Sequence, residues 1–236
     1  MRPVVRTPMD VTPMRPALLS ATALASSIAF LVPGGALAQS PLDWSGFYAG
    51  LSAGVLGSSS DIELSDYDTI TGPDAVTVEG FGGLIGATVG YNQQLGSFVL
   101  GVETDASVVG QVLSTTFGSD PTEYDAETTL SSLLTLRARL GYAAGNMLFY
   151  GTAGLAGGQA SFSTNNVGSN AAASGFTTGV VAGAGVEVAV NDNVSIKTEG
   201  LMYQLSPLSD VSDSGKYNAE YQPSGVVVRS GVNFKF

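Results

Sequence analysis

Apolar and polar residues alternate in the last twelve residues of the chain, Gly225–Phe236. Apart from Ser230, one set of alternate positions is apolar and comprises Val226, Val228, Val232, Phe234 and Phe236. The other set carries two cations and an amide, at Arg229, Lys235 and Asn233. A period of two is typical of a β-strand with one apolar and one polar face. Whether the protein is soluble or spans a membrane therefore depends on whether such apolar faces contact a protein core or lipid.

The same alternation recurs along the chain and predicts eight strands. They are Trp44–Gly57, Gly82–Asn92, Phe98–Val108, Leu130–Tyr142, Met147–Ser161, Phe176–Val190, Val194–Leu205 and Gly225–Phe236. Three connections are tight and rich in turn-forming residues: Gln93–Ser97, Ala143–Asn146 and Asn191–Asn193. The other four are predicted to be long loops: Ser58–Phe81, Val109–Thr129, Phe162–Gly175 and Ser206–Ser224. Long and short connections alternate strictly, so an up-and-down sheet places every long loop at one end and both termini at the other.

Charged residues in the predicted strands all lie on the face opposite the apolar row. We expect eight of them to form a charge network in a lumen: Glu103, Asp105, Arg137, Arg139, Glu187, Lys197, Glu199 and Arg229. With Lys235, five strand bases face four strand acids, and this near balance favours mutual neutralisation in a confined space. The period alone also fits a soluble barrel or sandwich, in which the charged face meets water.

Two further patterns favour a membrane barrel over a soluble one. The connections are acidic, with six Asp or Glu residues in Ser58–Phe81 and four in Val109–Thr129. Aromatic residues gather at strand ends, as Trp44, Phe47 and Tyr48 do, which is typical of the two membrane interfaces. We therefore predict an all-β fold, an eight-stranded antiparallel up-and-down transmembrane β-barrel with a plugged or very narrow lumen. A cation on the lipid face would cost about 2–4 kcal/mol near the midplane.

The first 38 residues have the features of a secretory signal peptide. A basic segment with three arginines precedes the apolar run Ala17–Val32, and Ala36-Leu37-Ala38 fits a cleavage site. We expect residues 1–38 to be removed and residues 39–236 to form the barrel domain. The mature chain would hold six basic and nineteen acidic residues, a net charge of −13. This acidity excludes nucleic acid as an expected partner, since phosphate binding needs clustered Lys and Arg.

Five segments resemble those of a known family. They read WSGFYAGLSAG, VLGVETDAS, LLTLRARLGYA, LFYGTAGLAGG and VSIKTEGLMYQL. In this order they resemble the small outer-membrane β-barrel proteins of diderm bacteria, the porin-like and opacity-type surface-antigen family. The resemblance implies an eight-stranded barrel in the outer membrane, with extracellular long loops and periplasmic termini. It also implies insertion by the barrel-assembly machinery, with Val226, Val228, Val232, Phe234 and Phe236 as the assembly signal. The expected partners are outer-membrane lipid, lipopolysaccharide, that machinery, and host or phage surface ligands.

Chemistry-bearing residues are scarce. The chain has no His and no Cys, which excludes a His-dependent hydrolase and poorly supports transition-metal or haem ligation. Glu103 and Asp105 are interpreted as charges balanced by Arg137 and Arg139 rather than as an acid–base pair. The acidic connections lack the spacing of an EF-hand; solvated acidic loops are the favoured interpretation, with divalent bridging to lipopolysaccharide as the alternative. We expect no enzyme activity, cofactor or metal site.

Two functions agree with these observations. In the first, the protein is a structural and surface-interaction barrel that supports the envelope and presents its loops. In the second, it is a narrow porin that passes ions or small solutes. Arg137, Arg139, Glu103 and Glu187 in one layer would fill the bore of an eight-stranded barrel, which favours the first. Planar-bilayer conductance separates the two.

The last strand is expected to pair with the first and remove both sheet edges.

Overall fold

The computed structural model describes residues 42–66, 75–110, 113–117, 124–166, 169–211 and 217–236. The chain divides into two units, Met1–Ala38 and Gln39–Phe236. The first unit, which holds the predicted signal peptide, lies outside the described residues. All regular structure in the described part of the second unit is β-strand. Among the described residues, no helix is both long enough and apolar enough to cross a membrane.

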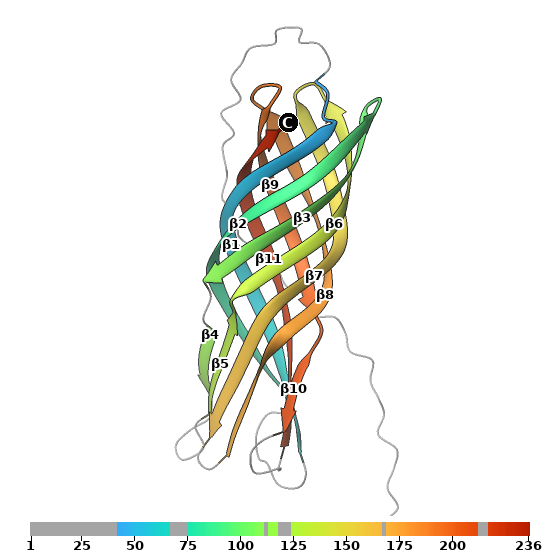
Figure 1. Cartoon of the computed structure of the whole chain (residues 1–236). Coiled ribbons are helices and arrows are strands. Elements are labelled where there is room, and N and C mark those ends of the chain that lie inside the picture. The colour runs from blue at the N-terminus through green and yellow to red at the C-terminus, as the bar shows by residue number, and fades with distance from the viewer. Residues whose placement is uncertain (1–41, 67–74, 111–112, 118–123, 167–168, 212–216) are drawn as a thin grey trace, which may run out of the picture. The chain divides into compact units, whose positions relative to one another are not determined.

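Eight long strands form a closed antiparallel barrel (Figure 1). They are β1 (Gly46–Asp66), β2 (Ala75–Leu95), β3 (Phe98–Gly110), β6 (Ser132–Ala144), β7 (Met147–Asn166), β8 (Ser169–Ala189), β9 (Val194–Leu205) and β11 (Tyr217–Lys235). Each strand pairs with the next in this order, and β11 pairs with β1, so the sheet has no free edge within the barrel. The prediction of an eight-stranded up-and-down barrel is confirmed.

The seam between the first and last strands is long and continuous. It runs from Tyr48 opposite Lys235 to Asp66 opposite Tyr217. The backbone N–H of Phe236 adds a bond of 3.0 Å to the carbonyl of Phe47. This pairing confirms the predicted closure and satisfies backbone groups that lipid could not satisfy.

The three tight connections lie at the end of the barrel that also carries Phe236 (Figure 1). Two of them place glycine at the first turn position, with φ of +65° at Gly96 and +62° at Gly145. A positive φ there is typical of the primed hairpin turns that match the twist of the flanking strands. In the third, the Asn191 side chain accepts bonds of 2.9 Å from the backbone N–H groups of Asn193 and Val194.

The four connections predicted as long loops contain much more strand than expected. β1 continues to Asp66, and β7 and β8 continue to Asn166 and Ser169. Three further strands lie in these connections: β4 (Leu113–Phe117), β5 (Tyr124–Leu130) and β10 (Leu208–Val211). β4 pairs with β5, β5 with β7, and β10 with β11. The prediction of loops is wrong here. A strand outside the lipid needs only a hydrogen-bonding partner for its backbone, so it lacks the apolar row from which the other strands were predicted.

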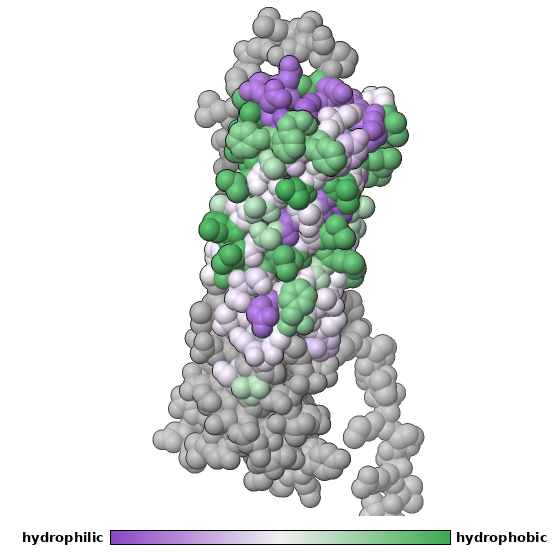
Figure 2. All heavy atoms as spheres, in the orientation of Figure 1, coloured by the Kyte–Doolittle hydropathy of each residue, from purple (hydrophilic) through white to green (hydrophobic). Residues whose placement is uncertain are grey.

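The outer surface of the barrel carries an apolar band (Figure 2). Large apolar residues with more than half of their surface exposed include Phe47, Leu51, Ile85, Leu155 and Met202. On β2 the exposed Phe81 and Tyr91 are ten residues apart, or about 33 Å along a strand. With the usual strand tilt this corresponds to a band about 25 Å tall, which matches a membrane barrel. A soluble protein would not expose so continuous an apolar surface.

Candidate functional site

The barrel interior places all eight residues of the expected lumen network in buried positions. They lie on five strands, with Glu103 and Asp105 on β3, Arg137 and Arg139 on β6, Glu187 on β8, Lys197 and Glu199 on β9, and Arg229 on β11. Each has at most 3% of its surface exposed. The four acids and four bases leave the network with no net charge. The alternation of each strand turns these residues inward, because their neighbours in sequence contact the outside.

Six of these residues form a central cluster of ion pairs. Arg137 contacts Asp105 at 2.8 Å, Glu199 at 3.0 Å, and Glu103. Arg229 donates hydrogen bonds to both carboxylate oxygens of Asp105, at 2.8 and 2.9 Å, and also contacts Glu199 at 2.7 Å. Lys197 contacts Glu103 at 3.0 Å. Forked guanidinium–carboxylate contacts of this kind are strong and fix the geometry of both groups.

The remaining pair, Arg139 and Glu187, is joined to the central cluster through two tyrosines. The Tyr48 hydroxyl donates to Glu103 at 2.7 Å and accepts from Arg139 at 3.4 Å. The Tyr150 hydroxyl donates to Glu199 at 3.2 Å, and its ring lies 3.7 Å from the Arg139 guanidinium carbon. Sequence reasoning missed both tyrosines as members of the network. The alternation could have revealed them, because Tyr48 on β1 and Tyr150 on β7 occupy the alternate positions that face inward.

Apolar side chains border the network on both sides along the barrel. Beyond Arg229 and Glu199, toward the extended strands, the next inward residues are Val227 and Leu201, each 1% exposed. Toward the tight turns, a buried cluster includes Trp44, Val99, Leu148 and Tyr150. Because the charged residues are at most 3% exposed, they interact in a medium of low dielectric constant.

Interior glycines make room for the large side chains on neighbouring strands. Tyr48 lies opposite Gly90, Tyr150 opposite Gly185, and Tyr203 opposite Gly225. A Cβ atom at any of the three glycines would come within 2.4–2.7 Å of the facing tyrosine side chain. The alternation of large and small residues lets the side chains fit in a narrow bore.

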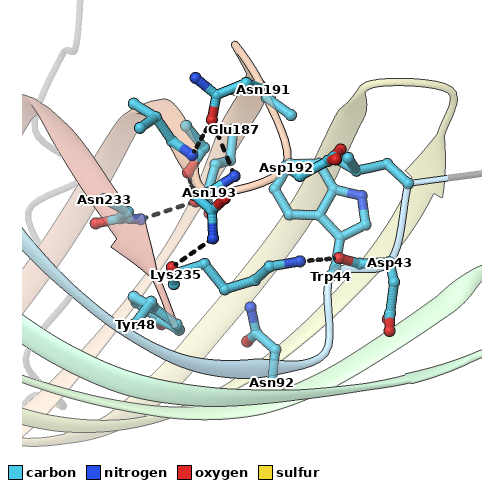
Figure 3. Close-up of a pocket in the computed structure, with 14 residues that line it drawn as sticks. Asp43, Trp44, Tyr48, Asn92, Glu187, Asn191, Asp192, Asn193, Asn233 and Lys235 are labelled. Atoms are coloured by element: carbon cyan, nitrogen blue, oxygen red, sulfur yellow. Dashed lines mark hydrogen bonds between the residues drawn. The ribbon is translucent and has the colours of Figure 1, made fainter. Parts of the chain in front are cut away.

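The segment before β1 lies at the turn end of the barrel, where Asp43 and Trp44 stand beside Lys235 (Figure 3). Trp44 is buried there, and its backbone N–H donates to the Gln94 side chain at 2.8 Å. The prediction that Trp44 and Tyr48 belong to an interfacial aromatic belt is wrong, since both lie inside, whereas Phe47 contacts the outside. Lys235 reaches across the opening and donates to the backbone carbonyl of Asp43. The pKa of the Asp43 carboxyl is lowered, chiefly because the Ser45 backbone N–H donates to it at 2.8 Å.

A small pocket lies beside this segment at the turn end. Its cavity volume is about 20 Å³, which is room for about one water molecule. Asn191, Asp192 and Asn193 line one side of it, and Lys235 crosses it (Figure 3). Trp44, Glu187 and Ser195 also line it. Within the described part of the chain, no group of three or more His, Cys, Asp or Glu residues is arranged to hold a metal ion.

The residues expected to form an assembly signal share one face of the last strand. Val228, Val232, Phe234 and Phe236 are exposed on the outside of the barrel, and Val226 is partly exposed on the same face. Their alternate neighbours Val227, Arg229 and Asn233 are buried inside. The last strand therefore presents an outward apolar row that ends on an aromatic residue.

A closed eight-stranded barrel with an apolar exterior and a neutral, buried charge network defines an integral membrane barrel. Residues 22–236 match the sequence family described as the outer membrane protein beta-barrel domain. The chain belongs to this family. It is an outer-membrane protein. Its localisation and its resemblance to small outer-membrane barrels, both expected from the sequence, are confirmed.

Relatives extend over most of the chain. The 31 kDa outer-membrane immunogenic protein of Brucella melitensis biotype 1 is 35% identical over 93% of this chain and 96% of its own length. The 22 kDa outer membrane protein of Rhizobium leguminosarum bv. viciae is 31% identical over 81% of this chain and 78% of its own length. Among solved structures, the outer membrane protein OprG from Pseudomonas aeruginosa is similar in fold, with a TM-score of 0.51 at 13% identity over 81% of this chain and 96% of that chain.

Proposed function

We propose that this protein is a closed, non-catalytic barrel that supports the outer membrane and presents its extended strands at the cell surface. The observation that carries the proposal is the content of the bore. Four acids and four bases neutralise one another between two apolar layers, so a permeating ion would have to break ion pairs in a medium of low dielectric constant. A filled lumen supports a structural role over a porin.

The surface part of the proposal is supported by the strands that extend beyond the apolar band and by the name of the Brucella relatives, which are immunogenic proteins of the outer membrane. Surface exposure of the corresponding part of this chain would account for a similar property. The proposed partners are outer-membrane lipid and lipopolysaccharide, the barrel-assembly machinery, and host or phage surface ligands. The absence of His from the chain supports a role without hydrolytic chemistry.

Planar-bilayer recording of refolded protein tests the closed bore. We expect no conductance steps from the wild type. Arg137→Ala removes the guanidinium that contacts three carboxylates and is expected to produce a noisy leak. Leu136→Ala, the matched control on the lipid face of the same strand, should stay silent. Reproducible steps from the wild type would overturn the closed bore, and their loss in Arg137→Ala would replace this proposal with the narrow porin.

A further inference from the structure

The segment Leu42–Ser45, which we call the strap, precedes β1 and lies across the turn end of the barrel (Figure 3). We propose that the strap is a seal that is held by contacts from both sides of the seam and that limits the access of water from this end to the Arg139–Glu187 pair, so that Glu187, although it lines the small pocket beside the strap, is only 3% exposed. The proposal deepens the closed-barrel function, because it assigns the turn-side closure to four residues outside the strands.

The strap is attached to strands on both sides of the β1–β11 seam. On one side, Gln94 at the end of β2 accepts from the Trp44 backbone N–H at 2.8 Å and donates its own backbone N–H to Ser45 at 3.0 Å. On the other side, Lys235 of β11 donates to the backbone carbonyl of Asp43. The backbone of Lys235 is itself fixed by Asn193, which contributes its carbonyl at 2.8 Å and its side-chain amide at 3.1 Å.

The Trp44 indole packs in a site assembled from distant parts of the chain. Val99 comes from β3, and Leu148 and Tyr150 come from β7. Neither β3 nor β7 is paired with β1, so the indole joins the start of the chain's first strand to side chains on more distant strands of the barrel.

Packing on Tyr150 connects the strap to the charge network. The Tyr150 ring stacks on Arg139 at 3.7 Å, and Arg139 pairs with Glu187. Glu187 also accepts from the Ser195 hydroxyl and, at 2.8 Å, from the Asn233 side chain. Glu187 and Trp44 both line the small pocket at the turn end. Removing the indole would therefore free the Tyr150 ring on its turn side and widen the path for water from this pocket to Glu187.

Fluorescence gives the first test, because Trp44 is the single tryptophan of the chain. In folded protein in bilayers, we expect blue-shifted emission, weak quenching by acrylamide, and weak quenching by brominated lipid. The matched control moves the indole to the lipid face with Trp44→Phe and Phe47→Trp, since Phe47 is 61% exposed on the outside. That variant should be quenched several-fold more strongly by brominated lipid. Equal lipid quenching of the two proteins would overturn the interior strap.

Thiol labelling gives the second test, in a chain that has no native cysteine. Ser195→Cys places a probe beside Glu187, at a position where the native serine is 8% exposed. We expect a small charged maleimide to label it at least ten-fold faster in a Trp44→Ala background than with Trp44 present, and Trp44→Phe to keep labelling slow. Heat-modifiable gel migration verifies that each variant is folded. Unchanged labelling in a folded Trp44→Ala variant would overturn the seal.

The two proposals fail in different experiments. Wild-type conductance would overturn the closed-barrel function, whereas the strap is judged by lipid quenching and labelling rates. If Trp44→Ala does not fold, the Phe47→Trp comparison still decides whether the indole lies in the lumen.

Discussion

Single charged residues in the bore are stabilised only together with their partners. Arg139 is 2% exposed and contacts the Glu187 carboxylate, while its Nε atom has no partner in the described part of the chain. Removing one member of such a pair leaves the other charge buried and uncompensated, which costs about 3–5 kcal/mol. Removing both members is much less costly when apolar residues of similar volume replace them.

We therefore expect Glu187→Leu to destabilise the folded barrel by about 3–5 kcal/mol, and Arg139→Met combined with Glu187→Leu to recover most of that loss. Urea unfolding in lipid bilayers measures both changes. Val188→Leu, on the adjacent outward position, is the control and should change stability little. Arg139→Met alone completes the cycle, and a double variant whose loss equals the sum of the two single losses would show that the pair is not coupled.

Glycine spacing gives a second prediction for single residues. A Cβ atom on Gly154 would lie 2.0 Å from the Leu136 carbonyl oxygen and 2.7 Å from the Arg137 Cα, both backbone atoms, whereas a Cβ on Gly83 meets nothing within 4 Å. We expect Gly154→Ala to cost about 1–3 kcal/mol or more through overpacking and Gly83→Ala to be nearly neutral. Unfolding midpoints of the two variants check this, and equal midpoints would contradict the steric account.

The inward position of the charged strand residues could be predicted from the sequence. Once the apolar row of a strand is known to face lipid, its alternate residues must face the bore. The same parity also places Tyr48 and Tyr150 inside, since Phe47 and Phe149 take the outward positions. The prediction of an aromatic belt rests on position at the strand end and ignores parity, which is why it is wrong for Trp44 and Tyr48. The particular partners could not be predicted, because strand stagger decides which layers meet across the bore.

At the scale of the element, the last strand combines two roles. Its inward row supplies Arg229 and Asn233 to the lumen, and its outward row ends in Phe234 and Phe236. Bonds to β1 close the seam along this strand, and Phe236 adds the last backbone bond, to Phe47.

Deletion of Phe236 is therefore expected to lower the amount of protein in the outer membrane several-fold, since it removes both the terminal aromatic residue and that bond. Phe236→Tyr keeps the ring and the backbone and should insert normally. Quantitative blotting of membrane fractions, with heat-modifiable migration as the test of folding, measures the difference. Wild-type levels of the truncated protein would contradict the assembly-signal interpretation.

Strand length was the element property that sequence reasoning predicted least well. The bounds of Val194–Leu205 were predicted correctly, because lipid on one side and the network on the other mark both faces of β9. β1, β7, β8 and β11 continue beyond that region, where neither lipid nor a packed bore requires alternation. Their pairing is set by backbone hydrogen bonds to the neighbouring strand, which leave no pattern in the sequence.

At the scale of the whole molecule, the two ends of the barrel differ in construction. One end has three tight turns, the strap and the seam contact at Phe236, whereas the other has the extended strands and β4, β5 and β10 (Figure 1). In outer-membrane barrels the short turns are periplasmic and the longer connections extracellular. By this rule we expect the polar residues at the turn end (Figure 2) to face the periplasm.

This asymmetry predicts which tags are accessible on intact cells. An epitope inserted between Asp66 and Ala75, in the connection from β1 to β2, should bind antibody without permeabilisation, because the assembled barrel carries this end outward. The same epitope between Gly145 and Asn146, in a tight turn, should bind only after the outer membrane is opened. Flow cytometry measures both, with heat-modifiable migration showing that each tagged barrel has folded. Antibody binding to the Gly145 tag on intact cells, with none to the other, would mean that the strap and Lys235 face the cell exterior and that the extended strands face the periplasm.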